Sequence, residues 1–114
     1  MSSSTGIPIV CRPGALTVEQ RQRSQTLRRE LATATQEVTA LPDGYAFQYP
    51  PDAALFQRVA EWISLERRCC PFLSFELTWA RGDETPSRLS VTGPRGTKAF
   101  LSAQLPELPH ADLG

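Results

Sequence analysis

Several features that mark common classes of protein are scarce in this chain. It has one histidine, and its twelve basic residues are balanced by twelve acidic ones. A neutral chain lacks the basic excess that is typical of proteins binding nucleic acid or an anionic membrane surface. No run of residues approaches the ~20 apolar positions of a membrane span. We therefore expect neither a nucleic acid nor a membrane as a partner.

Cysteine is also scarce, and its three copies are an odd number. An odd count cannot be completed into disulfides within one chain, which is typical of proteins from a reducing compartment. Residues 1–11 carry no signal-peptide pattern, and we expect a cytoplasmic location. The chain has no Cys-x-x-Cys pair. The sequence therefore does not predict a zinc finger or a zinc ribbon.

The length and composition predict one small globular domain. Its 114 residues are 40% hydrophobic and 21% charged, which is ordinary for a folded domain with one core. We expect this domain to cover residues 1–114, with flexible tails at 1–6 and 107–114.

The most strongly patterned stretch begins at Asp52, whose carboxylate is suited to cap a helix after Pro50 and Pro51. Apolar residues recur at helical spacing along it, namely Leu55, Phe56, Val59, Trp62 and Ile63. The same stripe continues to Glu66, where a leucine would be expected. Buried carboxylates are rare unless they are paired, so Glu66 indicates a site.

Pro71 should end this helix and keep Cys70 out of the α conformation. Cys69 is then the last helical residue and Cys70 the first extended one. Such a break allows two neighbouring sulfurs to turn the same way. A disulfide between them is disfavoured, because consecutive Cα atoms are only about 3.8 Å apart.

The remaining chain predicts further helices and two hairpins. The expected elements are an arm at 7–11, a helix at 18–36 with a Thr17/Gln20 capping box, a hairpin at 38–49, strands at 73–80 and 88–92, and a short helix after Thr97. Helices on one face of an antiparallel sheet would bury the apolar stripes. We therefore expect an α+β two-layer sandwich of about four strands, in the order α-ββ-α-ββ-α.

The arm that ends in Cys11 needs a docking place, and the end of the Asp52 helix is a candidate. If the arm docks there, Cys11, Glu66, Cys69 and Cys70 converge. Three sulfurs and one oxygen suit zinc, while the sulfurs alone suit softer ions such as Cu(I), Cd(II) or Hg(II). The sequence therefore predicts a thiophilic metal site made by these four residues.

Two alternatives stay open at this point. The cysteines could be inert core residues of a structural or interaction domain, with the aromatic sheet face or the Asp52 helix forming a homodimer. A redox protein with a Cys11–Cys69 or Cys11–Cys70 disulfide is the third interpretation. Cysteine catalysis is disfavoured, because a helix C-terminus and Glu66 both oppose a thiolate. No catalytic residue and no organic cofactor are predicted.

Several segments together resemble a group of short, uncharacterised bacterial proteins. They are Ile9-Val10-Cys11, the arginine-rich helix, Pro42-Asp43-Gly44, Glu66-Arg67-Arg68-Cys69-Cys70-Pro71-Phe72 and Gly93-Pro94-Arg95-Gly96. The segment Glu-x-x-Cys-Cys-x-Phe is the most specific of these. The resemblance implies a bacterial, cytosolic, single-domain protein and implies no activity.

Overall fold

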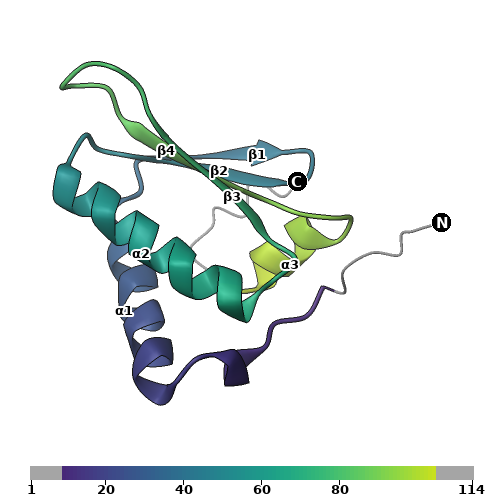
Figure 1. Cartoon of the computed structure of the whole chain (residues 1–114). Helices are drawn as coiled ribbons and strands as arrows, with labels where there is room; N and C mark the ends of the chain where they lie inside the picture. Colours follow the sequence, from purple (N-terminus) through teal and green to yellow (C-terminus); the bar gives the residue numbers. More distant parts are fainter. Residues whose placement is uncertain (1–8, 105–114) are drawn as a thin grey trace.

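The computed structural model describes residues 9–104, which form helices and a sheet in the predicted order (Figure 1). The elements are η1 (Pro13–Ala15), α1 (Val18–Ala34), β1 (Glu37–Leu41), β2 (Gly44–Tyr49), α2 (Ala53–Cys69), β3 (Ser74–Trp79), β4 (Ser87–Thr92) and α3 (Thr97–Gln104). The predicted α+β class is confirmed. The tails expected at 1–6 and 107–114 lie outside the described residues. Within residues 9–104, no helix is long and apolar enough to cross a membrane.

Both long helices begin at the predicted caps. The Thr17 hydroxyl accepts a hydrogen bond from the Gln20 amide at 3.0 Å, and the Gln20 side chain accepts one from the Thr17 amide at 2.9 Å. The Asp52 carboxylate accepts from the Leu55 amide at 3.0 Å. Each cap satisfies amides that the first helical turn leaves free, which stabilises a helix by about 1 kcal/mol.

The four strands form one antiparallel sheet in the order β1-β2-β4-β3. Each hairpin pairs its own two strands, and β2 joins β4 at the centre, where Phe47 faces Leu89. The helices cover one face of the sheet (Figure 1). The central strands are therefore buried beneath α1 and α2, as a two-layer sandwich requires.

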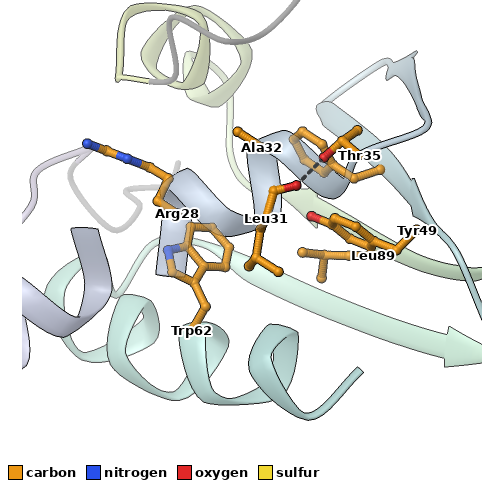
Figure 2. Close-up of a pocket in the computed structure, with 8 residues that line it drawn as sticks. Arg28, Leu31, Ala32, Thr35, Tyr49, Trp62 and Leu89 are labelled. Atoms are coloured by element: carbon orange, nitrogen blue, oxygen red, sulfur yellow. Dashed lines mark hydrogen bonds between the residues drawn. The ribbon is translucent and has the colours of Figure 1, made fainter. Parts of the chain in front are cut away.

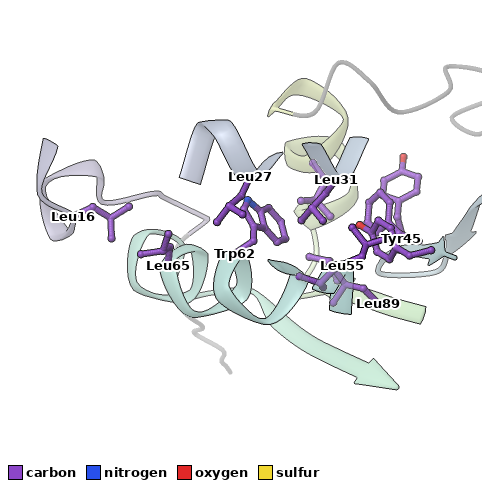
Figure 3. Close-up of a cluster of buried hydrophobic side chains, with 13 residues drawn as sticks. Leu16, Leu27, Leu31, Tyr45, Leu55, Trp62, Leu65 and Leu89 are labelled. Carbon is purple, nitrogen blue, oxygen red and sulfur yellow. The ribbon is translucent and has the colours of Figure 1, made fainter. Parts of the chain in front are cut away.

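The core lies between the helices and the covered face of the sheet (Figure 3). It contains the buried side chains of the two central strands, namely Tyr45, Phe47, Tyr49, Leu89 and Val91. Trp79, which shares a face with Phe75 and Leu77, is 36% exposed. It lies at the end of the edge strand, where its ring centroid is 5.0 Å from that of Phe56.

The N-terminal arm docks at the end of α2. The backbone amide of Arg12 donates to the carbonyl of Cys69, and Arg68 Nη2 donates to the carbonyl of Ala15 at 3.2 Å. Leu16 is 6% exposed and belongs to the core. The predicted arm forms no strand within its described residues, while Ile7 and Pro8 lie outside them. These contacts bring the arm to the predicted place.

Candidate functional site

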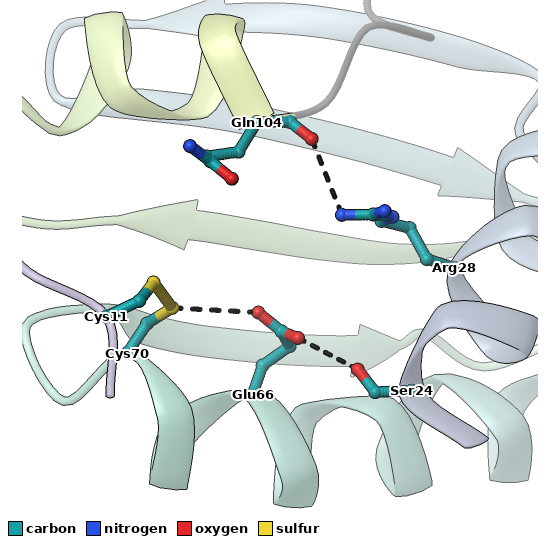
Figure 4. Close-up of a disulfide and its surroundings, with 6 residues drawn as sticks. All are labelled: Cys11, Ser24, Arg28, Glu66, Cys70 and Gln104. Atoms are coloured by element: carbon teal, nitrogen blue, oxygen red, sulfur yellow. Dashed lines mark hydrogen bonds between the residues drawn. A yellow bond between two sulfur atoms is a disulfide. The ribbon is translucent and has the colours of Figure 1, made fainter. Parts of the chain in front are cut away.

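Three cysteine sulfurs gather at the end of α2. The sulfurs of Cys11, Cys69 and Cys70 all lie within 4.8 Å of one another. Cys11 and Cys70 are joined as a disulfide across 59 positions of sequence, with their Cα atoms 4.4 Å apart (Figure 4). Cys69 is the free cysteine of the described chain. The predicted approach of the three cysteines is confirmed, and Cys70, rather than Cys69, is the partner of Cys11.

The end of α2 explains how neighbouring cysteines share one site. Cys69 is the last helical residue, and Cys70 leaves the helix with φ −122° and ψ 78°. The Cys70 amide still donates to the Glu66 carbonyl at 2.7 Å, which completes the last turn. Cys70 is 3% exposed, whereas Cys11 and Cys69 are half-buried. The predicted helix break before Pro71 therefore places one sulfur in the interior and leaves its neighbour beside it.

Glu66 is half-buried and lies between two helices. Its Oε2 accepts a hydrogen bond from the hydroxyl of Ser24, on α1, at 2.9 Å, and its Oε1 lies 3.8 Å from Cys70 Sγ (Figure 4). Ser24 thus supplies the partner that a buried carboxylate requires. A disulfide sulfur carries no proton. The contact with Cys70 is therefore a hydrogen bond when the carboxyl is protonated, or when Cys70 is a thiol.

The electrostatics of the site favour uncharged groups. Burial raises the pKa of the Glu66 carboxyl, although the Ser24 hydroxyl and the charge of Arg28 act in the opposite direction. Burial and the nearby Glu66 charge also raise the pKa of the Cys69 thiol, against smaller effects of the Arg12 amide and Arg21. Cys69 is therefore a protonated, weakly nucleophilic thiol at neutral pH.

A cavity of about 330 Å³ opens beside the disulfide. All three cysteines line it, and its polar side chains are Arg21, Ser24, Gln25, Arg28, Glu66 and Gln104. Leu73 and Phe100 contribute to its apolar wall. This volume is at the lower end of the range typical of small-molecule sites. The sulfur site therefore faces a space that can admit a small reactant.

Trp62 and Arg28 line this cavity and also a second one, of about 30 Å³ (Figure 2). The second cavity is surrounded mainly by apolar side chains and has room for about one water. Trp62 is 6% exposed, and its indole N–H finds no hydrogen-bond partner among the described residues. A buried donor without a partner is costly, so this N–H is a point where a bound acceptor would be stabilised.

The sequence reasoning did not identify Ser24, Arg28 or Gln104. A signal for Ser24 was present, because it shares a helical face with Leu27 and Leu31 and therefore interrupts the buried stripe of α1. Arg28 and Gln104 had no such signal. Arg28 Nη1 donates to the Gln104 carbonyl at 3.4 Å, and this contact depends on how α1 and α3 pack.

No family model, curated protein or solved structure matches the chain.

Proposed function

We propose that this protein is a thiol–disulfide redox protein whose reactive pair is Cys11 and Cys70. The observation that carries the proposal is the Cys11–Cys70 disulfide, which lines a cavity and has a half-buried carboxyl 3.8 Å from its inner sulfur. A purely structural disulfide needs neither the cavity nor the carboxyl. Both are useful to a disulfide that is opened and closed.

The arrangement gives the two sulfurs different roles. Cys11 is half-buried and Cys70 is 3% exposed, so an incoming thiolate reaches the Cys11 sulfur more easily. Attack there forms a new S–S bond to Cys11 and breaks the bond to Cys70, whose sulfur takes the electron pair. Protonated Glu66 is placed to give this sulfur a proton. On reoxidation the carboxylate takes the proton back as the Cys70 thiol becomes a nucleophile.

The low reactivity of Cys69 allows Cys11 and Cys70 to keep these separate roles. Its sulfur is close to both members of the pair, and a Cys69 thiolate could attack the disulfide and rearrange it. Burial and Glu66 raise the pKa of Cys69, which keeps the thiolate scarce at neutral pH. The Cys11–Cys70 pairing is therefore kept.

The test is a redox titration of the folded protein in buffers of reduced and oxidised dithiothreitol, with far-UV circular dichroism to follow folding. We expect two thiols per chain to appear together and to disappear on reoxidation, in the Cys69→Ser variant as in the wild type. Thiols that appear only in denaturant would contradict the redox role. That result would favour the alternative in which the cysteines are inert core residues of a structural or interaction domain.

A second candidate is the thiophilic metal site, which only the reduced protein could form. The close approach of all three sulfurs favours it. Thiolates about 2.3 Å from a zinc ion are roughly 4 Å from one another, so opening the disulfide would require only a small movement. Cys69 separates the two candidates, because the metal site needs its sulfur and the redox pair does not.

A further inference from the structure

We infer that the cavity beside Cys11 binds a small thiol carrying a carboxylate, and that this molecule is the reductant of the Cys11–Cys70 disulfide. The inference rests on the proposed redox function and adds the class of substrate. The charges, the unpaired donor, the size of the cavity and the position of the sulfurs support it.

The charged side chains that line the cavity favour an anion. Arg21 and Arg28 both come from α1, and Glu66 is the carboxyl opposite them. Arg28 is half-buried, and it donates a long hydrogen bond of 3.4 Å to the Gln104 backbone carbonyl, which does not neutralise its charge. A guanidinium at a partly dry site binds a carboxylate strongly, because it offers two parallel N–H donors.

The rest of the wall fits a short molecule with a polar end and an apolar body. Trp62, whose buried N–H is unpaired among the described residues, and Gln25 supply further hydrogen-bonding groups. Leu73 and Phe100 supply apolar surface. A volume of about 330 Å³ suits a small molecule rather than a peptide segment of another protein.

The sulfurs that line the cavity indicate that the reactive group of the ligand is a thiol. Figure 4 shows Arg28 and Gln104 on one side, and the Cys11–Cys70 disulfide with Glu66 on the other. All of these residues line the same cavity. A ligand held by its carboxylate at Arg28 can therefore direct its other end toward Cys11, where a thiol has a reaction partner.

The reaction balances with two molecules of this thiol. The first, as a thiolate, attacks the Cys11 sulfur, which gives a mixed disulfide with Cys11 and a Cys70 thiolate that takes up one proton. The second attacks the ligand sulfur of the mixed disulfide and releases Cys11 as a thiol. The sum is two small thiols oxidised to one small disulfide, while the protein disulfide is reduced to two thiols.

The test compares three small thiols as reductants of the folded, oxidised protein: 3-mercaptopropionate, 2-mercaptoethanol and cysteamine. With each rate expressed per thiolate, we expect the anionic thiol to react about tenfold faster than the neutral one, and the cationic thiol to be slowest. Arg28→Gln should remove this preference. Arg29→Gln, on the same helix but outside the cavity, should keep it.

An unreactive analogue tests the site in the unaltered chain. The thioether 3-(methylthio)propionate should slow reduction by 3-mercaptopropionate competitively, and it should lose this effect in Arg28→Gln while keeping it in Arg29→Gln. Equal rates for the three thiols, together with no competition, would overturn the substrate class and leave the redox function standing. If none of the thiols opens the disulfide in the folded protein, the redox function itself fails.

Discussion

The carboxyl of Glu66 lies 3.8 Å from the sulfur of Cys70, the residue that directly follows the helix carrying Glu66. Burial raises the pKa of this carboxyl, and burial disfavours a charged Cys70 sulfur in the same way. When the proton passes from Glu66 to Cys70, the negative charge stays on the carboxylate, which the Ser24 hydroxyl and the charge of Arg28 stabilise, instead of on the buried sulfur. This relationship makes the inner half of the disulfide suited to leave as a thiol rather than as a thiolate.

Glu66→Gln should therefore slow reduction of the disulfide by a small thiol. The amide cannot transfer a proton to Cys70. General acid catalysis commonly accelerates a reaction by a factor of about 100 or more, and we expect the variant to be reduced at least about tenfold more slowly than the wild type. Stopped-flow reduction with 2-mercaptoethanol, expressed per thiolate, measures the change. The wild-type rate should fall as the pH rises through the pKa of Glu66, and the variant should show no such step. Equal rates and equal pH profiles would exclude Glu66 as a proton donor.

The free energy of unfolding should also depend on the ionisation of Glu66. Folding raises the pKa of Glu66. The contribution of this carboxyl to stability is therefore fully present below about pH 4.3, its ordinary pKa in the unfolded chain, and is lost as the pH rises through its pKa in the folded protein. Glu66→Gln should remove this loss, so the variant gains stability relative to the wild type between pH 4 and pH 8. Urea unfolding at both pH values measures the difference.

Glu61 provides a matched control on the same helix. Its ion pair with Arg23, at 2.9 Å, lowers its pKa, so its small contribution is present above about pH 4.3 and is lost as the pH falls through the folded value. Glu61→Gln should therefore change the pH dependence with the opposite sign. If both variants behaved alike, the burial of Glu66 would not be the cause.

Removing the disulfide should destabilise the oxidised protein. The bond closes a loop across 59 positions, for which the loss of chain entropy in the unfolded state corresponds to about 4 kcal/mol, and measured disulfides commonly give about 2–4 kcal/mol. Cys11→Ser should lose stability in this range without reductant. With reductant present, the variant and the wild type should unfold at similar urea concentrations. Cys69→Ser is the control, and a comparable loss in that variant would contradict the Cys11–Cys70 pairing.

The free thiol of Cys69 should react slowly with alkylating agents near neutral pH. Burial and Glu66 raise its pKa, and only the thiolate is a good nucleophile. We expect iodoacetamide labelling of the oxidised protein to accelerate up to and beyond pH 9, and Glu66→Gln to shift this profile to lower pH. Mass spectrometry of the intact protein follows the reaction. Labelling at pH 7 as rapid as that of a small thiol would contradict the assignment.

The reduced protein tests the metal interpretation directly. If three thiolates form the site, reduced wild type should bind one equivalent of Zn(II) or Hg(II), and Cys69→Ser should bind Zn(II) at least about tenfold more weakly, because one of three sulfur ligands is lost. Titration with a chromogenic competitor for the ion measures the affinity. Glu66→Gln reports whether the carboxylate is a fourth ligand. Equal affinities in all three proteins would rule out the predicted site.

Much of the local structure could be predicted from single residues. Asp52 and the Thr17/Gln20 box begin the helices, and Pro71 separates Cys69 from Cys70, as short-range backbone chemistry requires. The choice of Cys70 as the partner of Cys11 could not be predicted. It depends on where the arm docks, through contacts that join residues far apart in sequence.

The hydrogen-bond partner of Glu66 could likewise not be predicted from the sequence. Ser24 reaches Glu66 because α1 packs against α2 at that level, and helical periodicity specifies a buried face without specifying what faces it. The cavity follows the same rule, since it exists only where α1, α2, α3 and the arm meet. The types of its lining residues can be read from the sequence, but their proximity depends on the tertiary structure.

The most direct test of a reversible Cys11–Cys70 pair is a peptide map under non-reducing conditions, made on folded protein taken through one cycle of reduction and reoxidation. We expect a peptide pair linked through Cys11 and Cys70 to disappear on reduction and to return on oxidation, with Cys69 alkylatable throughout. A link through Cys69, or a Cys11–Cys70 link that persists until the protein is unfolded, would contradict a reversible redox pair at this site.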